Sequence, residues 1–386
     1  MSAEDRAFLE EVMTNGIINE GDRMKTILNQ LVSYLDDIKS KSESASESEC
    51  TPSPAPSADE IEILLQELQD IVEQIDYAMS FSAMGGLPFL IGCASQTNSI
   101  PTSIRAACLS VLATVCQNNP KVQYNMLELG NIPKLVDIYF AEYLTSTITT
   151  ENEYGNDNGD GSSAIQAKAL QAMSCCVRNH AIGEKIFCMN QEGRKMIESA
   201  LGLYSHVSES ASESELQPLP LPPPNATLRR KALFFLQALV TSDFADADRI
   251  NLFTTSIQYV ATRFLDPDME SNDVAVAADL QLREMTLSML TRILDQKKSV
   301  NAVLDVHVKN YLVGLGVKRV LEMRALEAGE EKEMVEEELR LWELLIMELA
   351  RGVRDEVNVN VDGDGAEEPL MLGSIPENDT GDSLAQ

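Results

Sequence analysis

The hydrophobic positions of this chain repeat at the offsets i, i+4, i+7, i+8 and i+11 in four segments. The segments are 104–118, 165–179, 228–242 and 282–295. Residues at these offsets lie on one side of an α-helix, so each segment is predicted to be a helix with one buried face. A helix of this kind recurring roughly every 45 to 60 residues is typical of a helical solenoid, which usually binds another protein. The positions predicted to form the core are Ile104, Cys108, Val111, Leu112, Val115, Ile165, Ala169, Ala172, Met173, Cys176, Leu228, Ala232, Phe235, Leu236, Leu239, Leu282, Thr286, Met289, Leu290 and Ile293.

The polar stretches between the apolar segments predict the organisation of the chain. Ser/Glu/Pro-rich and Gly/acid-rich stretches cannot bury enough apolar surface to fold, so we expect them to be disordered. The predicted regions are an N-terminal helix pair (1–40), a disordered linker (41–59), a repeat domain (60–353) and a disordered acidic tail (354–386). Acidic or proline-rich insertions are expected within the repeat domain near 145–161, 205–227 and 266–276.

The last apolar stripe, between Val335 and Leu349, predicts a helix with Glu-rich flanks. A terminal helix with a polar outer face would cap a solenoid. Shortly before it, Gly314-Leu315-Gly316 is expected to be a turn between two helices. The fold predicted from these patterns is all-α.

Composition narrows the possible partners. Only 5% of the residues are aromatic, which favours helices over sheets. The chain has 61 acidic and 30 basic residues and a formal charge of −31, which argues against nucleic acid or an anionic membrane as the main partner. No apolar run approaches the roughly 20 residues of a membrane span, and the first residues lack a secretory signal pattern. We therefore expect a cytoplasmic or nuclear protein.

Residues with the potential for chemistry are scattered. The chain has seven cysteines without a C-x-x-C pair and only three histidines, so we expect no metal site and reduced, mostly buried cysteines, with a redox or metal role as the alternative. Nucleotide-binding glycine motifs, H-E-x-x-H and G-x-S-x-G are absent from the sequence. We therefore predict a protein that is not an enzyme and needs no cofactor.

A second stripe lies beside the core positions of the four repeat helices. It is mixed in character, and it carries Lys168, Arg178, Lys231 and Arg292 on an acidic chain. A basic stripe on an acidic protein suggests an acidic protein partner, although helices also place Lys and Arg at exposed positions without a binding role. The stripe is predicted to contain Ala107, Ser110, Thr114, Gln117, Lys168, Gln171, Cys175, Arg178, Lys231, Phe234, Ala238, Thr241, Met285, Ser288, Arg292 and Asp295.

Several segments resemble the heat-shock-protein-70-binding-protein family of armadillo-type nucleotide exchange factors, in its cytosolic Fes-type branch. The resemblance extends over residues 4–350, is strongest up to Asn179 and is interrupted by the insertions. The segments that carry it are Glu4–Met13, Leu68–Ala78, Met84–Leu87, Ile104–Ala107, Gln117–Pro120, Lys168–Ser174 and Val177–Asn179.

The resemblance implies an armadillo-like solenoid and a function. Members of this family bind the ATPase domain of a 70-kDa heat-shock chaperone in their concave face and promote release of ADP. It therefore implies a monomeric adenyl-nucleotide exchange factor with a cytosolic chaperone as its partner. The residues that it and the repeat positions suggest for chaperone binding are Arg105, Gln117, Lys168, Gln171, Arg178, Arg230, Lys231 and Arg292.

One departure qualifies the resemblance. The family often has Asp-Asn-Ala-x-Asp-Phe where this chain has Asp76-Tyr77-Ala78-Met79-Ser80-Phe81, which changes a local contact. The alternative function is an armadillo adaptor that binds extended peptides without exchange activity. Such adaptors usually keep a ladder of Trp and Asn, and the matching Trp-type positions here are Ser110, Gln171, Phe234 and Ser288.

Overall fold

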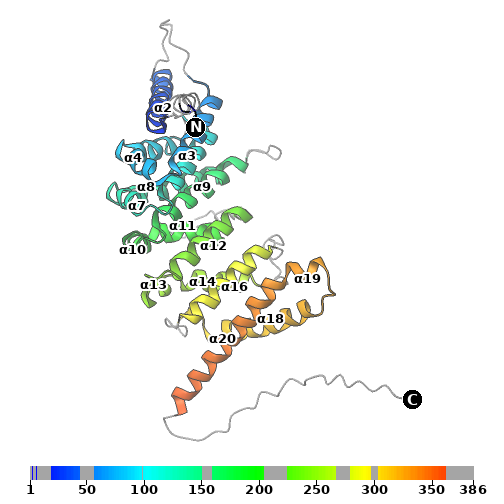
Figure 1. The fold of residues 1–386 in the computed structure, drawn as a ribbon. Coiled ribbons are helices and arrows are strands. Elements are labelled where there is room, and N and C mark those ends of the chain that lie inside the picture. The colour runs from blue at the N-terminus through cyan, green and yellow to red at the C-terminus, as the bar shows by residue number, and fades with distance from the viewer. Residues whose placement is uncertain are drawn as a thin grey trace, which may run out of the picture.

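The structure is a computed structural model that describes residues 2, 6, 19–43, 56–97, 99–149, 159–203, 224–266, 279–296 and 303–361. Every regular element within these ranges is a helix, so the predicted all-α fold is confirmed. The helices form an elongated stack that starts at the N-terminal α2 and ends at α20 (Figure 1).

The stack is built from repeats of three helices, in which the third helix is usually the longest. Three helices per repeat is the armadillo arrangement, so the predicted armadillo-like solenoid is confirmed. The successive repeats are α4 (Ile75–Ala83), α5 (Gly86–Ala94) and α6 (Thr102–Cys116); α7 (Pro120–Glu128), α8 (Asn131–Thr149) and α9 (Gly159–Val177); α10 (Ala181–Met189), α11 (Gln191–Leu201) and α12 (Ala226–Val240); and α13 (Ala247–Leu252), α14 (Thr254–Arg263) and α16 (Leu280–Asp295).

The third helices form a ladder along one side of the stack. The ladder begins with α3 (Ala58–Val72), which packs on α6, and continues through α9, α12 and α16 to α20 (Glu336–Val361). The first helices α4, α7, α10 and α13 lie along the other side of the stack (Figure 1). The ladder therefore presents one continuous surface made by successive repeats.

The core predicted from the repeated spacing is confirmed. All of the predicted positions in α6, α9, α12 and α16 are buried, and none is more than 3% exposed. The turns after α6 and α9 are also equivalent, because Asn118 and Asn179 both have positive φ angles, of 54° and 59°. Asparagine tolerates this left-handed conformation better than most residues, so it suits a helix end that turns sharply into the next repeat.

Buried ion pairs join neighbouring repeats. Arg105 on α6 contacts Glu142 on α8 at 2.6 Å, and Arg283 on α16 contacts Glu338 on α20 at 3.0 Å. Arg105 and Arg283 each follow the first core residue of a third helix, so they hold equivalent repeat positions. A buried guanidinium needs a carboxylate to offset its lost hydration, and here that carboxylate comes from the following repeat.

The prediction of a turn at Gly314–Gly316 is wrong, because both glycines lie inside α18 (Val306–Arg324). The reason is the packing of α20 against α18. A Cβ at Gly316 would lie only 2.8 Å from Cε3 of Trp342, which is fully buried. Gly316 thus serves as a point of close helix approach rather than as a turn.

The N-terminal helix α2 (Glu20–Glu43) packs on α3. The sequence alone leaves open whether this helix contacts the repeat domain. Arg23 forms a two-pronged pair with Glu67, with both contacts at 2.6 Å. The rest of the predicted N-terminal pair, within residues 1–18, lies outside the described residues apart from 2 and 6.

The predicted boundaries of the linker and the tail shift in the structure. The linker is shorter than predicted, because α2 extends to Glu43 and α3 begins at Ala58, after a capping box formed by Ser57 and Glu60. At the other end, α20 continues to Val361, beyond the predicted boundary at 353. The sequence there contains no proline, so each added residue can extend the helical hydrogen bonding.

Much of the remaining polar sequence lies outside the described residues. This applies to 44–55 in the linker, to 362–386 in the tail, and to 150–158, 204–223 and 267–278 around the three insertions. Within the described residues, no single helix is both long and apolar enough to cross a membrane, and α4 with α5 would reach that length only as a pair bent by 79°.

Candidate functional site

The predicted stripe beside the core lies on the surface of the third-helix ladder, and we call it the long-helix face. It comprises the positions predicted above, from Ala107 on α6 to Asp295 on α16. Most of these side chains are half-buried or exposed, whereas Cys175 and Thr241 are buried. A side-chain hydrogen bond from Gln237 on α12 to Ser288 on α16 links two neighbouring helices of the face. The sequence-predicted stripe is thus largely accessible to a partner.

The centre of this face is a group of five side chains from α9 and α12, which we call the basic cluster: Lys168, Gln171, Arg178, Lys231 and Phe234. The ammonium of Lys231 donates a hydrogen bond to Oε1 of Gln171 across the two helices. One turn along α12, the guanidinium carbon of Arg178 lies 4.6 Å from the centroid of the Phe234 ring. This distance is within the range of a cation–π interaction. The Phe234 side chain is nevertheless 46% exposed, so a large aromatic surface remains open beside the cations.

The positive charges of the cluster are uncompensated. Lys168, Arg178 and Lys231 form no ion pair with a carboxylate among the residues that the structure describes. Burial, and then repulsion from Lys168, lower the pKa of Lys231 below its ordinary value. Three basic groups that have no carboxylate in ion-pair contact within the described ranges would complement an anionic partner.

The short helix α7 stabilises the end of α9 that carries part of the basic cluster. The side-chain amide of Gln123 donates hydrogen bonds to the backbone oxygens of Cys175, at 2.8 Å, and of Arg178, at 3.0 Å. These oxygens lie at the C-terminal end of α9, where helix carbonyls have no partner within the helix. Sequence reasoning missed Gln123, because a contact between residues more than 50 positions apart leaves no local signal.

The other predicted partner-binding residues differ in their surroundings. The prediction is wrong for Arg105, which is only 2% exposed and is held by Glu142 and by the backbone oxygen of Ala94. Arg230 is paired with Asp279 at 2.7 Å, so its charge is already compensated. Gln117, the residue after α6, and Arg292 on α16 are exposed and lie outside the basic cluster.

The six described cysteines are buried, as predicted. Burial raises the pKa of Cys175, and it raises the pKa of Cys188 to about 11. Thiols with raised pKa values are poor nucleophiles and poor metal ligands at neutral pH. In the described part of the chain, no group of three His, Cys, Asp or Glu side chains is placed to hold a metal ion.

Comparisons with known proteins address the resemblance seen in the sequence. No family model matches the chain. The chain is 27% identical over 186 residues to proteins named Hsp70-binding protein 1 from Homo sapiens, Macaca fascicularis and Mus musculus. This similarity confirms the resemblance. The match covers 47% of this chain and 43 to 44% of these curated relatives, so it extends over less than half of their length.

Solved structures with a similar arrangement include two repeat-like proteins. One is an engineered protein with 10% identity and a TM-score of 0.45, covering 77% of this chain and 93% of the other. The second is a designed armadillo repeat protein with 11% identity and a TM-score of 0.44, covering 76% of this chain and 95% of the other.

Proposed function

We propose that this protein binds the ATPase domain of a cytosolic 70-kDa heat-shock chaperone and promotes the release of ADP from it. The observation that carries the proposal is the similarity to relatives named Hsp70-binding protein 1. The proposed exchange activity rests on the resemblance of the sequence to the exchange-factor family. Protein binding also suits a chain whose repeats present a continuous ladder of helices.

The basic cluster supports the location of the contact. Lys168, Arg178 and Lys231 offer uncompensated positive charge, and Phe234 offers exposed aromatic surface between them. Aromatic and arginine side chains often supply most of the energy of a protein interface. We therefore assign the chaperone contact to the long-helix face, with an acidic patch of the ATPase domain opposite the basic cluster.

The exchange activity follows from a difference between two affinities. A partner that binds the closed and the open ATPase domain equally well cannot shift the equilibrium between them. To promote ADP release, this protein must bind the open domain more tightly than the ADP-bound closed domain. By linkage, ADP must then weaken the binding of this protein by the same factor.

The activity is tested by the release of fluorescent ADP from a purified cytosolic Hsp70 after addition of the full chain and excess ATP. We expect the release rate to increase and to saturate with the concentration of this protein. The same Hsp70 with excess ATP alone gives the reference rate. An unchanged rate at saturating protein, together with binding of a nuclear-targeting or other extended peptide, would instead identify the peptide adaptor.

A further inference from the structure

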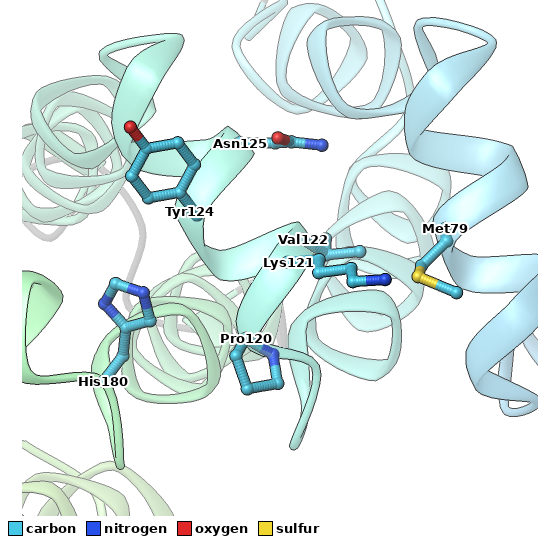
Figure 2. Close-up of a pocket in the computed structure, with 7 residues that line it drawn as sticks. All are labelled: Met79, Pro120, Lys121, Val122, Tyr124, Asn125 and His180. Atoms are coloured by element: carbon cyan, nitrogen blue, oxygen red, sulfur yellow. The ribbon is translucent and has the colours of Figure 1, made fainter.

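A cavity of about 520 Å³ lies among the first helices α4, α7 and α10, on the side of the stack away from the third-helix ladder (Figures 1 and 2). In Figure 2, α7 supplies the middle of the wall, Met79 of α4 lies on one side, and His180 at the start of α10 lies on the other. The lining residues are Met79, Pro120, Lys121, Val122, Tyr124, Asn125 and His180. None of them belongs to the long-helix face.

One part of the cavity is apolar. Met79 and Pro120 contribute accessible apolar side chains, whereas Val122 is fully buried, and Met79 is flexible enough to adapt to different shapes. Tyr124 also lines the cavity and is 45% exposed, which adds aromatic surface to it. An elongated ligand would cover more of this surface than a compact small molecule.

The other part of the cavity favours an anion. Lys121 provides an ammonium group without an ion pair among the described residues. The Nδ1 atom of His180 accepts a hydrogen bond from the backbone N–H of Gly183 at 3.0 Å, so the neutral ring carries its proton on Nε2. That Nε2–H has no partner in the described structure.

The direction of two helices also favours an anion in the cavity. Pro120 is the first residue of α7 and His180 is the N-cap of α10, so both nine-residue helices begin at the cavity. The N-terminus of a helix carries a partial positive charge, which favours negatively charged groups. Two helix starts, one ammonium and one imidazole N–H therefore act in the same direction, and the Glu128 carboxylate, which is hydrogen-bonded to the Tyr124 side chain, acts against them.

The walls of the cavity are fixed by contacts outside it. The amide of Asn125 donates a hydrogen bond to the hydroxyl of Ser82 at 3.0 Å and so joins α7 to α4. On the other side of α7, Gln123 is bound to the end of α9. A site whose walls are already held in place loses less conformational entropy when a ligand binds.

We propose that this cavity is a second docking site, which binds an extended peptide segment of a partner protein. The segment carries a carboxylate that contacts Lys121 and His180, next to an aliphatic side chain that contacts Met79 and Pro120. The volume lies within the ordinary range of ligand sites, roughly 300 to 1,000 Å³, and it accommodates about two side chains. The proposal does not depend on the exchange activity.

The test measures fluorescence polarisation of a fluorescein-labelled peptide of alternating aspartate and leucine residues with the full chain. A matched peptide has asparagine in place of each aspartate. We expect the acidic peptide to bind about threefold to fivefold more tightly than its matched partner, because the charged contact involves an exposed lysine. Lys121→Glu should weaken binding of the acidic peptide by a similar factor. The control is Lys332→Glu, the same charge change on exposed α19 (Glu330–Met334), which should change the affinity for this peptide less than about twofold.

A second variant, Met79→Gln, tests the apolar part of the cavity and should weaken the binding of both peptides. ADP release from Hsp70 and the circular dichroism spectrum should be unchanged in Lys121→Glu. Equal affinities for the two peptides, or equal losses in Lys121→Glu and Lys332→Glu, would overturn the proposal. Binding of a peptide of residues 4–13 without binding of the acidic peptide would also overturn it, because the cavity would then accept this chain's own N-terminal segment.

Discussion

The guanidinium of Arg178 lies 4.6 Å from the ring centroid of Phe234, and this contact joins the C-terminal end of α9 to the middle of α12 in the next repeat. The ring remains 46% exposed, so it is not part of the core. The ring therefore contacts a cation and still offers exposed aromatic surface.

Phe234→Ala should weaken binding to the Hsp70 ATPase domain by about tenfold or more, because an exposed aromatic side chain beside an arginine is a typical energetic centre of an interface. The unfolding free energy should change by less than about 1 kcal/mol. Titration calorimetry and urea unfolding measure the two quantities. Phe244→Ala is the matched control, because Phe244 is 47% exposed and lies outside the long-helix face. Similar losses of affinity in both variants would remove the special role of Phe234.

The uncompensated charge of Lys231 should reduce stability. Lys231→Met should stabilise the fold by about 0.5 kcal/mol in urea unfolding and at the same time weaken partner binding, because residues suited to a binding site are often poor for stability. Lys185→Met, at an exposed position on α10, should change neither quantity appreciably. A loss of stability in Lys231→Met would show that the hydrogen bond to Gln171 outweighs the repulsion.

The stabilising effect of Lys231→Met should depend on pH. The pKa of Lys231 is lower in the folded protein than its ordinary value, so the unfolded chain binds more protons between the two values. The penalty is therefore fully present below the folded-state pKa and is relieved as pH rises toward the ordinary pKa. Urea unfolding of the wild type and Lys231→Met should give a difference at neutral pH that shrinks in alkaline solution. A constant difference would contradict this origin.

The two glycines of α18 should respond in opposite ways to the same substitution. Gly316→Ala should destabilise the protein by about 1 to 3 kcal/mol, because the new Cβ would collide with Trp342. Gly314→Ala should stabilise it by up to about 1 kcal/mol, because an added Cβ there meets no atom within 4 Å and alanine favours a helix. Thermal unfolding of both variants checks the prediction. Equal effects would mean that α20 does not pack on α18 as described.

The sequence was sufficient to predict the core and the shared face of Lys168, Arg178 and Lys231, because both follow from equivalent positions in successive repeats. A binding role for that face stays a prediction. The sequence failed at Arg105, which lies one residue after a core position and so at the edge between the buried and the exposed face of α6. Its burial depends on Glu142, a contact 37 residues away. It also failed at Gly316, where a local glycine pattern predicts a turn and only the approach of Trp342 explains the helix.

The most direct measurement is the effect of the double variant Arg178→Glu with Lys231→Glu on Hsp70. We predict that its affinity for the ATPase domain falls at least about tenfold and that ADP release slows accordingly, because two attractive charges become repulsive. The matched control is Lys185→Glu with Arg263→Glu, which has the same charge change at exposed positions of α10 and α14 and should behave as the wild type. Wild-type affinity and ADP release in the folded Arg178→Glu, Lys231→Glu variant would contradict binding through the long-helix face.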